Sequence, residues 1–217
     1  MAIRYHTATF ENIPPEKRER ILRAASRVLG RDGIGGARMA DVASEAGVSH
    51  GSMFSYFPTK DDMVRAVIAR GMDIQAVRFA ASDDEGACFA DAVRAVFRSA
   101  WDEASAEPEL ISLWLSLSLA ENARFADAIL PLESDSTERW RRVVARGKAS
   151  GEIDGGVDER AAAYLLDALA AQLMKSRASG LERAKLELFV GSGLAESAPD
   201  RMADAVVAML SSSDSSN

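Results

Sequence analysis

The chain has 217 residues, enough for one or two domains, and its content of 47% hydrophobic and 27% charged residues is ordinary for a soluble globular protein. Its single cysteine, Cys88, excludes an intrachain disulfide, and the lack of an 18-residue apolar run or an apolar leader predicts a cytoplasmic protein without membrane contact. The formal net charge of −7, taken over the whole chain, argues against a nucleic-acid-binding protein.

The charge is divided unevenly along the chain, however. Residues 1–71 carry 11 Lys and Arg against 8 Asp and Glu, a net charge of +3. Residues 72–217 carry 15 against 25, a net charge of −10. This asymmetry suits a DNA-reading head on an acidic body, and the mild basicity of the head indicates that two heads act together.

A helix in the first part of the chain is predicted over residues 17–30, where apolar residues recur at three- and four-residue spacing. The glycine-rich run 31–36 then breaks the chain. Further on, Pro58 biases the preceding residue out of a helix. Thr59 and Asp62 resemble a capping box with Asp in place of Glu, and they predict the start of a new helix.

A two-helix pattern that starts at Met39 is the most informative feature of the sequence. Gly47 has the position at which a helix-turn-helix needs left-handed backbone. Ser49 follows as the N-cap of a second helix, about His50 to Tyr56, which would lie in the DNA major groove. Apolar or small residues fill the wedge between the two helices: Val42, Ala43, Ala46, Val48 and Met53.

These residues together resemble the TetR family of bacterial transcriptional regulators. The resemblance covers roughly the first third of the chain and rests on Asp41-Val-Ala, Ala46-Gly-Val-Ser, Gly51, Tyr56-Phe and Lys60. It implies an all-α protein with a three-helix helix-turn-helix DNA-binding head, residues 1–71, and a C-terminal helical bundle, residues 72–217, for effector binding and dimerisation. Two residues depart from the family pattern: Arg38 stands where Thr or Ser usually opens the first helix of the unit, and Phe54 stands where a Tyr usually supplies a phosphate-contacting hydroxyl.

We expect operator DNA to contact the second helix of the pair and its flanks. Serine hydroxyls and His50 can bond base edges or phosphates, and Gly51 lets the backbone come close. Tyr56 and Lys60 are expected to hold phosphates, although packing of Tyr56 against the first helix is an equally good interpretation. The full predicted set is Arg38, Ser49, His50, Gly51, Ser52, Ser55, Tyr56 and Lys60.

The rest of the chain is predicted to be helical, because Ala and Leu dominate over β-branched residues. Residues 109–121 fit the period of a strand and that of a helix equally well, and we predict a helix because no partner strand is evident. Cys88, on a helical face, is expected in the core. The other helices are expected over 59–80, 89–106, 124–150, 157–179 and 200–210.

Dimerisation is expected through the helices from Val157 to Ser179 and from Asp200 to Leu210. Residues 161–174 are apolar almost all round, whereas a surface helix needs one apolar stripe. Burial within one monomer explains this equally well, and the resemblance favours a homodimeric four-helix bundle. In the last helix the expected interface stripe is Ala203, Val206, Val207 and Leu210.

The sequence shows no catalytic residues, metal site or cofactor motif, since it has two histidines and lacks a His-Glu-x-x-His motif. The family resemblance implies instead a pocket for a small-molecule effector, and the middle of the chain is weakly similar to the choline-responsive BetI-like members. A cation over Trp would gain cation–π attraction, although most aromatic residues at helical spacing belong to the core. The candidate effector residues are Trp101, Trp114, Asn122, Phe125 and Trp140.

The sequence thus predicts a homodimeric transcriptional regulator, a repressor that a small-molecule effector releases from double-stranded operator DNA. The alternative is a helical small-molecule-binding protein or enzyme that keeps the fold without operator binding. The uncharged second helix and the missing Tyr at Phe54 support this alternative.

Overall fold

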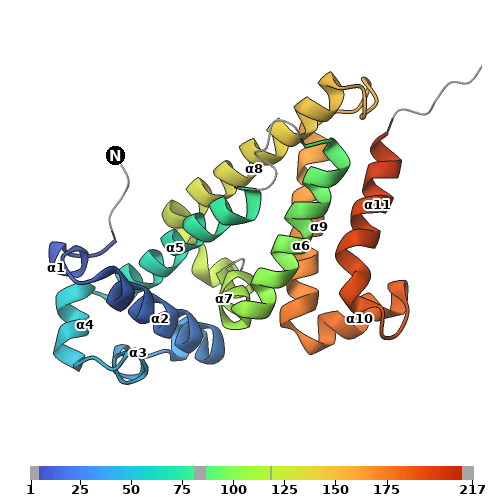
Figure 1. Ribbon diagram of the computed structural model, residues 1–217. Helices are drawn as coiled ribbons and strands as arrows, with labels where there is room; N and C mark the ends of the chain where they lie inside the picture. Colours follow the sequence, from blue (N-terminus) through green and yellow to red (C-terminus); the bar gives the residue numbers. More distant parts are fainter. Residues whose placement is uncertain (1–4, 81–86, 118, 212–217) are drawn as a thin grey trace, which may run out of the picture. The chain divides into compact units, whose positions relative to one another are not determined.

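A computed structural model describes residues 5–80, 87–117 and 119–211 (Figure 1). Within these ranges the regular structure is helical, beside an isolated antiparallel bridge between Ile153 and Ser211, so the expected all-α fold class is confirmed. The chain forms two compact units: unit 1 comprises residues 1–73 and 107–132, and unit 2 comprises residues 74–106 and 133–217. The expected boundary after residue 71 lies near the end of the first segment of unit 1, and residues 107–132 join that unit because they pack against its helices.

Unit 1 is built around α2 (Pro15–Gly36), which packs against α3 on one side and α7 on another. The second helix of the predicted pair, α4, contacts α3 and the short N-terminal α1. The remaining elements of unit 1 are α1 (Ala8–Glu11), α3 (Met39–Ala46), α4 (His50–Tyr56), the first part of α5 (Lys60–Ala80), α7 (Pro108–Leu117), the 3₁₀ helix η1 (Ala120–Phe125) and the start of α8 (Ala126–Ala149).

The helix α2 continues past residue 30 to Gly36, but non-helical backbone at Gly33 interrupts it inside the glycine-rich run where the sequence predicts a break. Gly33 accommodates a kink with φ 72° and ψ 163°, and its carbonyl oxygen still accepts the backbone N–H of Ala37. Gly30 allows α2 and α7 to touch backbone to backbone: a Cβ atom at this position would lie 2.0 Å from the carbonyl oxygen of Glu109.

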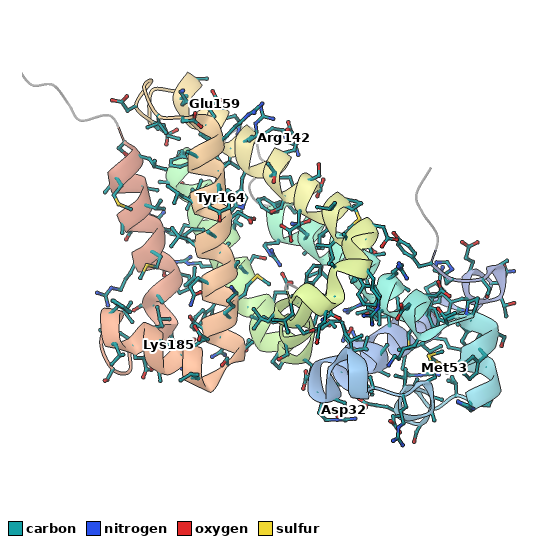
Figure 2. All side chains as sticks on the ribbon, turned by 180° about the vertical axis from the view of Figure 1, so that it is seen from behind. Asp32, Met53, Arg142, Glu159, Tyr164 and Lys185 are labelled. Atoms are coloured by element: carbon teal, nitrogen blue, oxygen red, sulfur yellow. The ribbon has the colours of Figure 1, made fainter. Side chains whose placement is uncertain are left out.

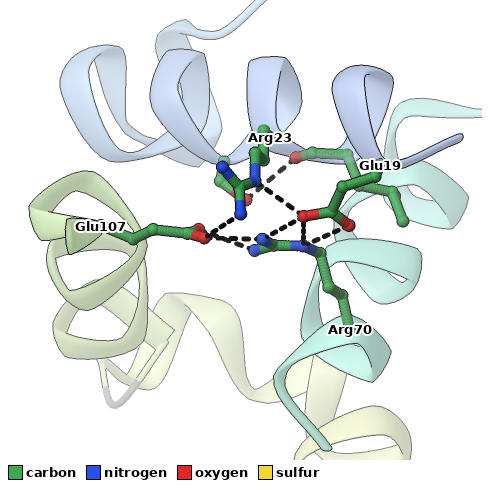
Figure 3. Close-up of polar contacts among 6 residues, drawn as sticks. Glu19, Arg23, Arg70 and Glu107 are labelled. Carbon is green, nitrogen blue, oxygen red and sulfur yellow. Dashed lines mark hydrogen bonds and ion pairs between the residues drawn. The ribbon is translucent and has the colours of Figure 1, made fainter. Parts of the chain in front are cut away.

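An ion network around the buried Arg70 ties three parts of unit 1 together (Figure 3). The Arg70 guanidinium of α5 bonds both carboxylate oxygens of Glu107, just before α7, at 2.6 and 2.7 Å. It also bonds Glu19 of α2 at 2.6 Å, and Arg23 lies 3.6 Å from Glu107. Since the Arg70 side chain is almost fully buried, these two carboxylates supply the charge compensation that burial requires.

Unit 2 packs α6 (Phe89–Ala106) against α9 (Glu159–Ala178) and α11 (Ala198–Leu210), with α10 (Gly180–Val190) against α9. The rest of α8 and the 3₁₀ helix η2 (Ala195–Ser197) complete the unit. Its core gathers apolar residues from α5, α6, α8, α9 and α11, with Trp140 fully buried beside Phe79 and Phe97. Asp158 caps α9, because its carboxylate accepts the N–H groups of Arg160 and Ala161 at 2.9 and 2.8 Å.

Two expectations from the sequence are wrong in detail. Cys88 is exposed rather than buried, because it precedes the first turn of α6 instead of lying on the inner face of that helix. In α11, Ala203, Val206 and Leu210 face the core of their own unit rather than a second chain. Leu173 of α9 is likewise 3% exposed and belongs to that core.

Candidate nucleic-acid interface

The turn between α3 and α4 has the geometry that the sequence predicts. Gly47 adopts φ 64° and ψ 41°, a left-handed conformation that costs glycine little. The N–H of Val48 reaches back to the carbonyl oxygen of Ala43 at 3.0 Å, and the N–H of Gly47 reaches that of Ser44 at 3.2 Å. These two bonds form a Schellman motif, which ends α3 and redirects the chain into α4.

Ser49 caps α4 as expected. Its Oγ accepts the backbone N–H of Ser52 at 3.1 Å, and the hydroxyls of the same two serines lie 2.7 Å apart. The Ser55 hydroxyl donates to backbone carbonyls one turn earlier, those of Gly51 and Ser52. Each predicted serine is therefore partly committed to the helix itself, and its remaining capacity for bonding DNA lies mainly in oxygen lone pairs.

The helix α4 has two distinct faces. Met53 and Tyr56 point into the core of unit 1, and Tyr56 is 5% exposed (Figure 2 labels Met53). His50, Gly51, Phe54 and Ser55 form the exposed face. None of these four carries a formal charge with His neutral, so this face is polar and aromatic rather than basic.

An aromatic pair lies on this exposed face. The rings of His50 and Phe54 stand edge to face with centroids 5.0 Å apart and an interplanar angle of 85°. Phe54 remains 48% exposed. The sequence analysis treated Phe54 as a lost hydroxyl and missed its role in this pair, although the spacing of four residues from His50 on a helix was a usable signal.

The N-terminal segment holds the end of α4 in place. The Thr7 hydroxyl donates to the carbonyl oxygen of Ser55 at 2.6 Å, and the Thr7 N–H donates to that of Tyr56 at 3.0 Å. Phe10 packs its ring against those of Tyr56 and Phe57. The sequence analysis did not predict α1, whose available signal was Thr7 as an N-cap before a four-residue helix.

The three remaining predicted DNA contacts differ in their surroundings. Arg38 is exposed at the start of α3, and its guanidinium makes no hydrogen bond or ion pair with any residue that the structure describes. The Lys60 ammonium donates to the carbonyl oxygens of Ile34, Gly35 and Ala37 at 2.7, 3.3 and 3.2 Å, where it caps the end of α2. The Tyr56 ring is packed, with Lys17 5.8 Å from its centroid.

Three of the candidate effector residues belong to unit 1. Trp114 packs against α5 so closely that a Cβ on Gly71 would lie 2.3 Å from its ring. The Asn122 amide donates to the carbonyl oxygen of Ser116 at 2.7 Å. The guanidinium groups of two arginines lie over the Phe125 ring, at 5.2 Å for Arg65 and 4.6 Å for Arg124.

The other two candidate effector residues belong to unit 2. The buried Trp140 donates its indole N–H to Asp167 at 3.1 Å, and the Ser136 hydroxyl donates to the same carboxylate at 2.6 Å. Trp101 donates to Glu196 at 3.0 Å, and the guanidinium of Arg177 lies 5.4 Å from its ring centroid. Hydrogen bonds from Arg183 and Trp101 keep the pKa of Glu196 below its usual value. All five candidate residues thus have protein partners of their own.

The described residues contain neither a metal-binding cluster nor a membrane-spanning helix. Within the described residues, no group of three or more His, Cys, Asp or Glu side chains is placed to hold a metal ion. No helix in that part of the chain is long and apolar enough to cross a membrane.

Comparison with known proteins identifies relatives of the chain. The HTH-type transcriptional repressor SCO4008 of Streptomyces coelicolor is 28% identical over 162 residues, which cover 72% of this chain and 78% of the relative. The HTH-type transcriptional regulator BetI of Stenotrophomonas maltophilia is 28% identical over 109 residues, which cover 49% and 55%. Among solved structures, the transcriptional regulator FadR from Bacillus subtilis in complex with stearoyl-CoA superposes with a TM-score of 0.70 at 18% identity, covering 89% of this chain and 97% of FadR.

The family match coincides with the helix-turn-helix. Residues 21–67 match the model of the bacterial regulatory proteins of the tetR family, and this segment includes α3, the Gly47 turn, α4 and its capping residue. The structural similarity to FadR shows, independently of the sequence match, that 89% of this chain shares the fold of FadR. Residues 21–67 of the chain are therefore similar to the helix-turn-helix segment of the tetR family of bacterial regulatory proteins.

Proposed function

We propose that this protein is a DNA-binding transcriptional repressor that a small-molecule effector releases from its operator. The observation that carries the proposal is the helix pair α3 and α4, whose turn, cap and exposed face have the geometry that DNA reading requires, inside the segment that matches the family. The relative SCO4008 is named a repressor, which supports the direction of regulation.

The proposed DNA contacts divide into two kinds. His50, Gly51 and the serines of α4 face outward and would read base edges, while Arg38 has a free guanidinium for a phosphate. An electrophoretic mobility shift with duplexes from the promoter regions beside the protein's own gene tests the function. A specific shift that outlasts excess random-sequence competitor DNA supports it, and the absence of any specific shift at low salt contradicts it.

Lys60 needs a measurement that separates two roles. If its ammonium holds a phosphate, Lys60→Ala weakens binding to all sequences and lowers the salt slope of log Kd by about one unit. If it only caps α2, the same variant loses stability and keeps the salt slope, since its three carbonyl partners belong to the protein. Lys185→Ala, at an exposed lysine of α10, is the control and should change neither quantity.

A homodimer would present two heads to the operator. We place its interface on the outer faces of α9 and α11, where Tyr164 and Met209 are each 74% exposed and Leu165 is also exposed. Small residues accompany them and would let helices of two chains approach closely: Ala161 and Ala168 on α9, and Ala205 and Ala208 on α11.

The effector is proposed to be a small molecule, and the candidate residues form two separate sets: Trp114, Asn122 and Phe125 in unit 1, and Trp101 and Trp140 in unit 2. The FadR structure contains stearoyl-CoA, which supports ligand control in this fold. The charge of −10 on residues 72–217 favours a cationic or neutral ligand over an anion. Choline and a long-chain acyl-CoA, a cation and an anion, can be compared by titrating each into the protein and following tryptophan fluorescence, with and without operator DNA. An effector that releases the operator must bind the DNA-bound protein more weakly than the DNA-free protein. A ligand that binds both forms with equal affinity is therefore not an effector.

A further inference from the structure

The recognition helix of this protein has an exposed aromatic ring near the middle of its outer face. Phe54 lies on the same side of α4 as His50, Gly51 and Ser55, opposite the buried Met53. A ring that is 48% exposed on a short helix leaves apolar surface in water, and its burial in a complex would stabilise that complex. Because the ring is uncharged, an apolar group is its best partner.

The Phe54 ring has an aromatic partner on its own helix. His50 lies one turn earlier and meets Phe54 edge to face, with 5.0 Å between the ring centroids. This contact restricts the Phe54 side chain before DNA is bound, so that less conformational entropy is lost on binding. Gly51, also one turn earlier, has no atom within 4 Å of the position where a Cβ would stand, and it leaves bare backbone beside the ring.

Hydrogen bonding from α4 is limited in comparison. The hydroxyls of Ser49 and Ser52 bond each other, and that of Ser55 bonds carbonyls of its own helix. The helix carries no Arg, Lys, Asn or Gln, which are the side chains that make bidentate contacts to purines. Apart from His50 and the remaining lone pairs of the serine hydroxyls, apolar contact is therefore the means of sequence discrimination that this helix offers.

We propose, on the basis of the DNA-binding function proposed above, that Phe54 is a specificity-determining residue that reads the 5-methyl group of a thymine in each operator half-site. The thymine methyl group is the apolar feature that base pairs present in the major groove, and phenylalanine is among the side chains that contact it.

The test removes the methyl group without changing the base pairing. Operator duplexes are first selected from a random-sequence pool with the full chain, and each thymine of the enriched sequence is then replaced by deoxyuridine. For the wild-type protein, one replacement in each of the two half-sites should weaken binding of the dimer roughly 15-fold, about fourfold for each methyl group lost. Phe54→Ala should bind the thymine duplex more weakly and should not distinguish thymine from deoxyuridine at that position.

The matched control is Phe189→Ala, which deletes another exposed phenylalanine, 87% exposed on α10, and should keep the wild-type response to deoxyuridine. Equal thermal unfolding of wild type and Phe54→Ala shows that the variant is folded. The inference is overturned if no thymine replacement affects the wild type, if the enriched sequence has no such thymine, or if Phe54→Ala responds to deoxyuridine as the wild type does. A selection that enriches no sequence at all contradicts the proposed function itself.

Discussion

Arg70 shows how a single charged side chain can be buried in a small helical unit. Its guanidinium meets two carboxylates from different parts of the chain, Glu19 of α2 and Glu107 before α7 (Figure 3). The pairing is bidentate toward both, which suits the planar fork of arginine and would not suit lysine. Removal of this one residue would leave two acidic groups with a single shared partner, Arg23.

We expect Arg70→Met to lower the free energy of unfolding by about 2 kcal/mol, because the Glu107 carboxylate, which is mostly removed from solvent, would lose its bidentate partner, while the more exposed Glu19 can be solvated. The control is Arg23→Met, which removes a half-exposed member of the same network and should cost less than about 1 kcal/mol. Urea unfolding followed by circular dichroism measures both. Equal losses for the two variants would show that burial of Arg70 contributes nothing.

The same network predicts a dependence on pH. Hydrogen bonding from Arg70 keeps the pKa of Glu19 below its usual value, against the opposing effect of desolvation. A carboxyl group whose pKa is lower in the folded state stabilises the protein above its unfolded pKa, about 4.3, and this contribution is lost as the pH falls through the folded pKa. The stability difference between wild type and Glu19→Gln should therefore be positive at pH 6 and shrink toward pH 3. A difference that stays constant over this range would contradict the assignment.

At the scale of elements, the turn between α3 and α4 depends on one backbone conformation. Gly47 has φ 64°, and a Cβ there would meet no atom within 4 Å, so a substitution is opposed by backbone strain rather than by a clash. We expect Gly47→Ala to cost roughly 1 kcal/mol or slightly more. Gly35→Ala is the control, since Gly35 has open space and no positive φ, and this variant should be neutral or stabilising. Thermal unfolding that ranks the two variants in the opposite order would refute the argument.

The elements that the sequence predicted well are those with a local chemical signal. The Gly47 turn, the Ser49 cap and the Thr59–Asp62 capping box all appear, the last with bonds of 3.0 and 3.1 Å. The ambiguous segment 109–121 is α-helical as predicted up to Leu117, whereas the 3₁₀ helix η1 begins at Ala120; residue 118 lies outside the described residues. The predicted break after residue 30 is present at Gly33, but helical structure resumes and ends at Gly36, where Lys60 caps carbonyl oxygens of α2.

The sequence could not predict which apolar helix faces are buried within the chain and which would be buried by a second chain. Periodicity shows that α11 has an apolar face, but it does not show whether the same chain or a second chain covers it. Val206 and Leu210 turned out to be covered by their own unit. The candidate site also has a predictable part and an unpredictable part. The exposure of His50 and Ser55 follows from the helix-turn-helix spacing. The three carbonyl partners of Lys60 could not be predicted, because they lie at the end of α2, far away in the sequence.

At the scale of the whole molecule, the proposed dimer can be tested with residues on the outer faces. We expect Leu165→Arg to shift the protein to monomer in sedimentation velocity at micromolar concentration, because the new charge would be buried without a partner at the interface. The monomer should remain folded, since Leu165 is exposed within its own chain. Leu173→Arg is the contrasting variant and should unfold the protein, as Leu173 belongs to the core. A folded Leu165→Arg dimer would place the interface elsewhere.

The contact at Gly30 has a mechanical consequence for unit 1. Where side chains separate two helices, a small displacement of one can be absorbed by a change of rotamer. At Gly30 the backbone of α2 rests on the backbone of Glu109, so no rotamer is available to absorb it. Arg20 and Arg27 fasten α3 to the same helix through Ala46 and Glu45. We therefore expect a displacement of the first turn of α7 to displace α2 by the same amount, and the helix pair α3 and α4 to move together with α2.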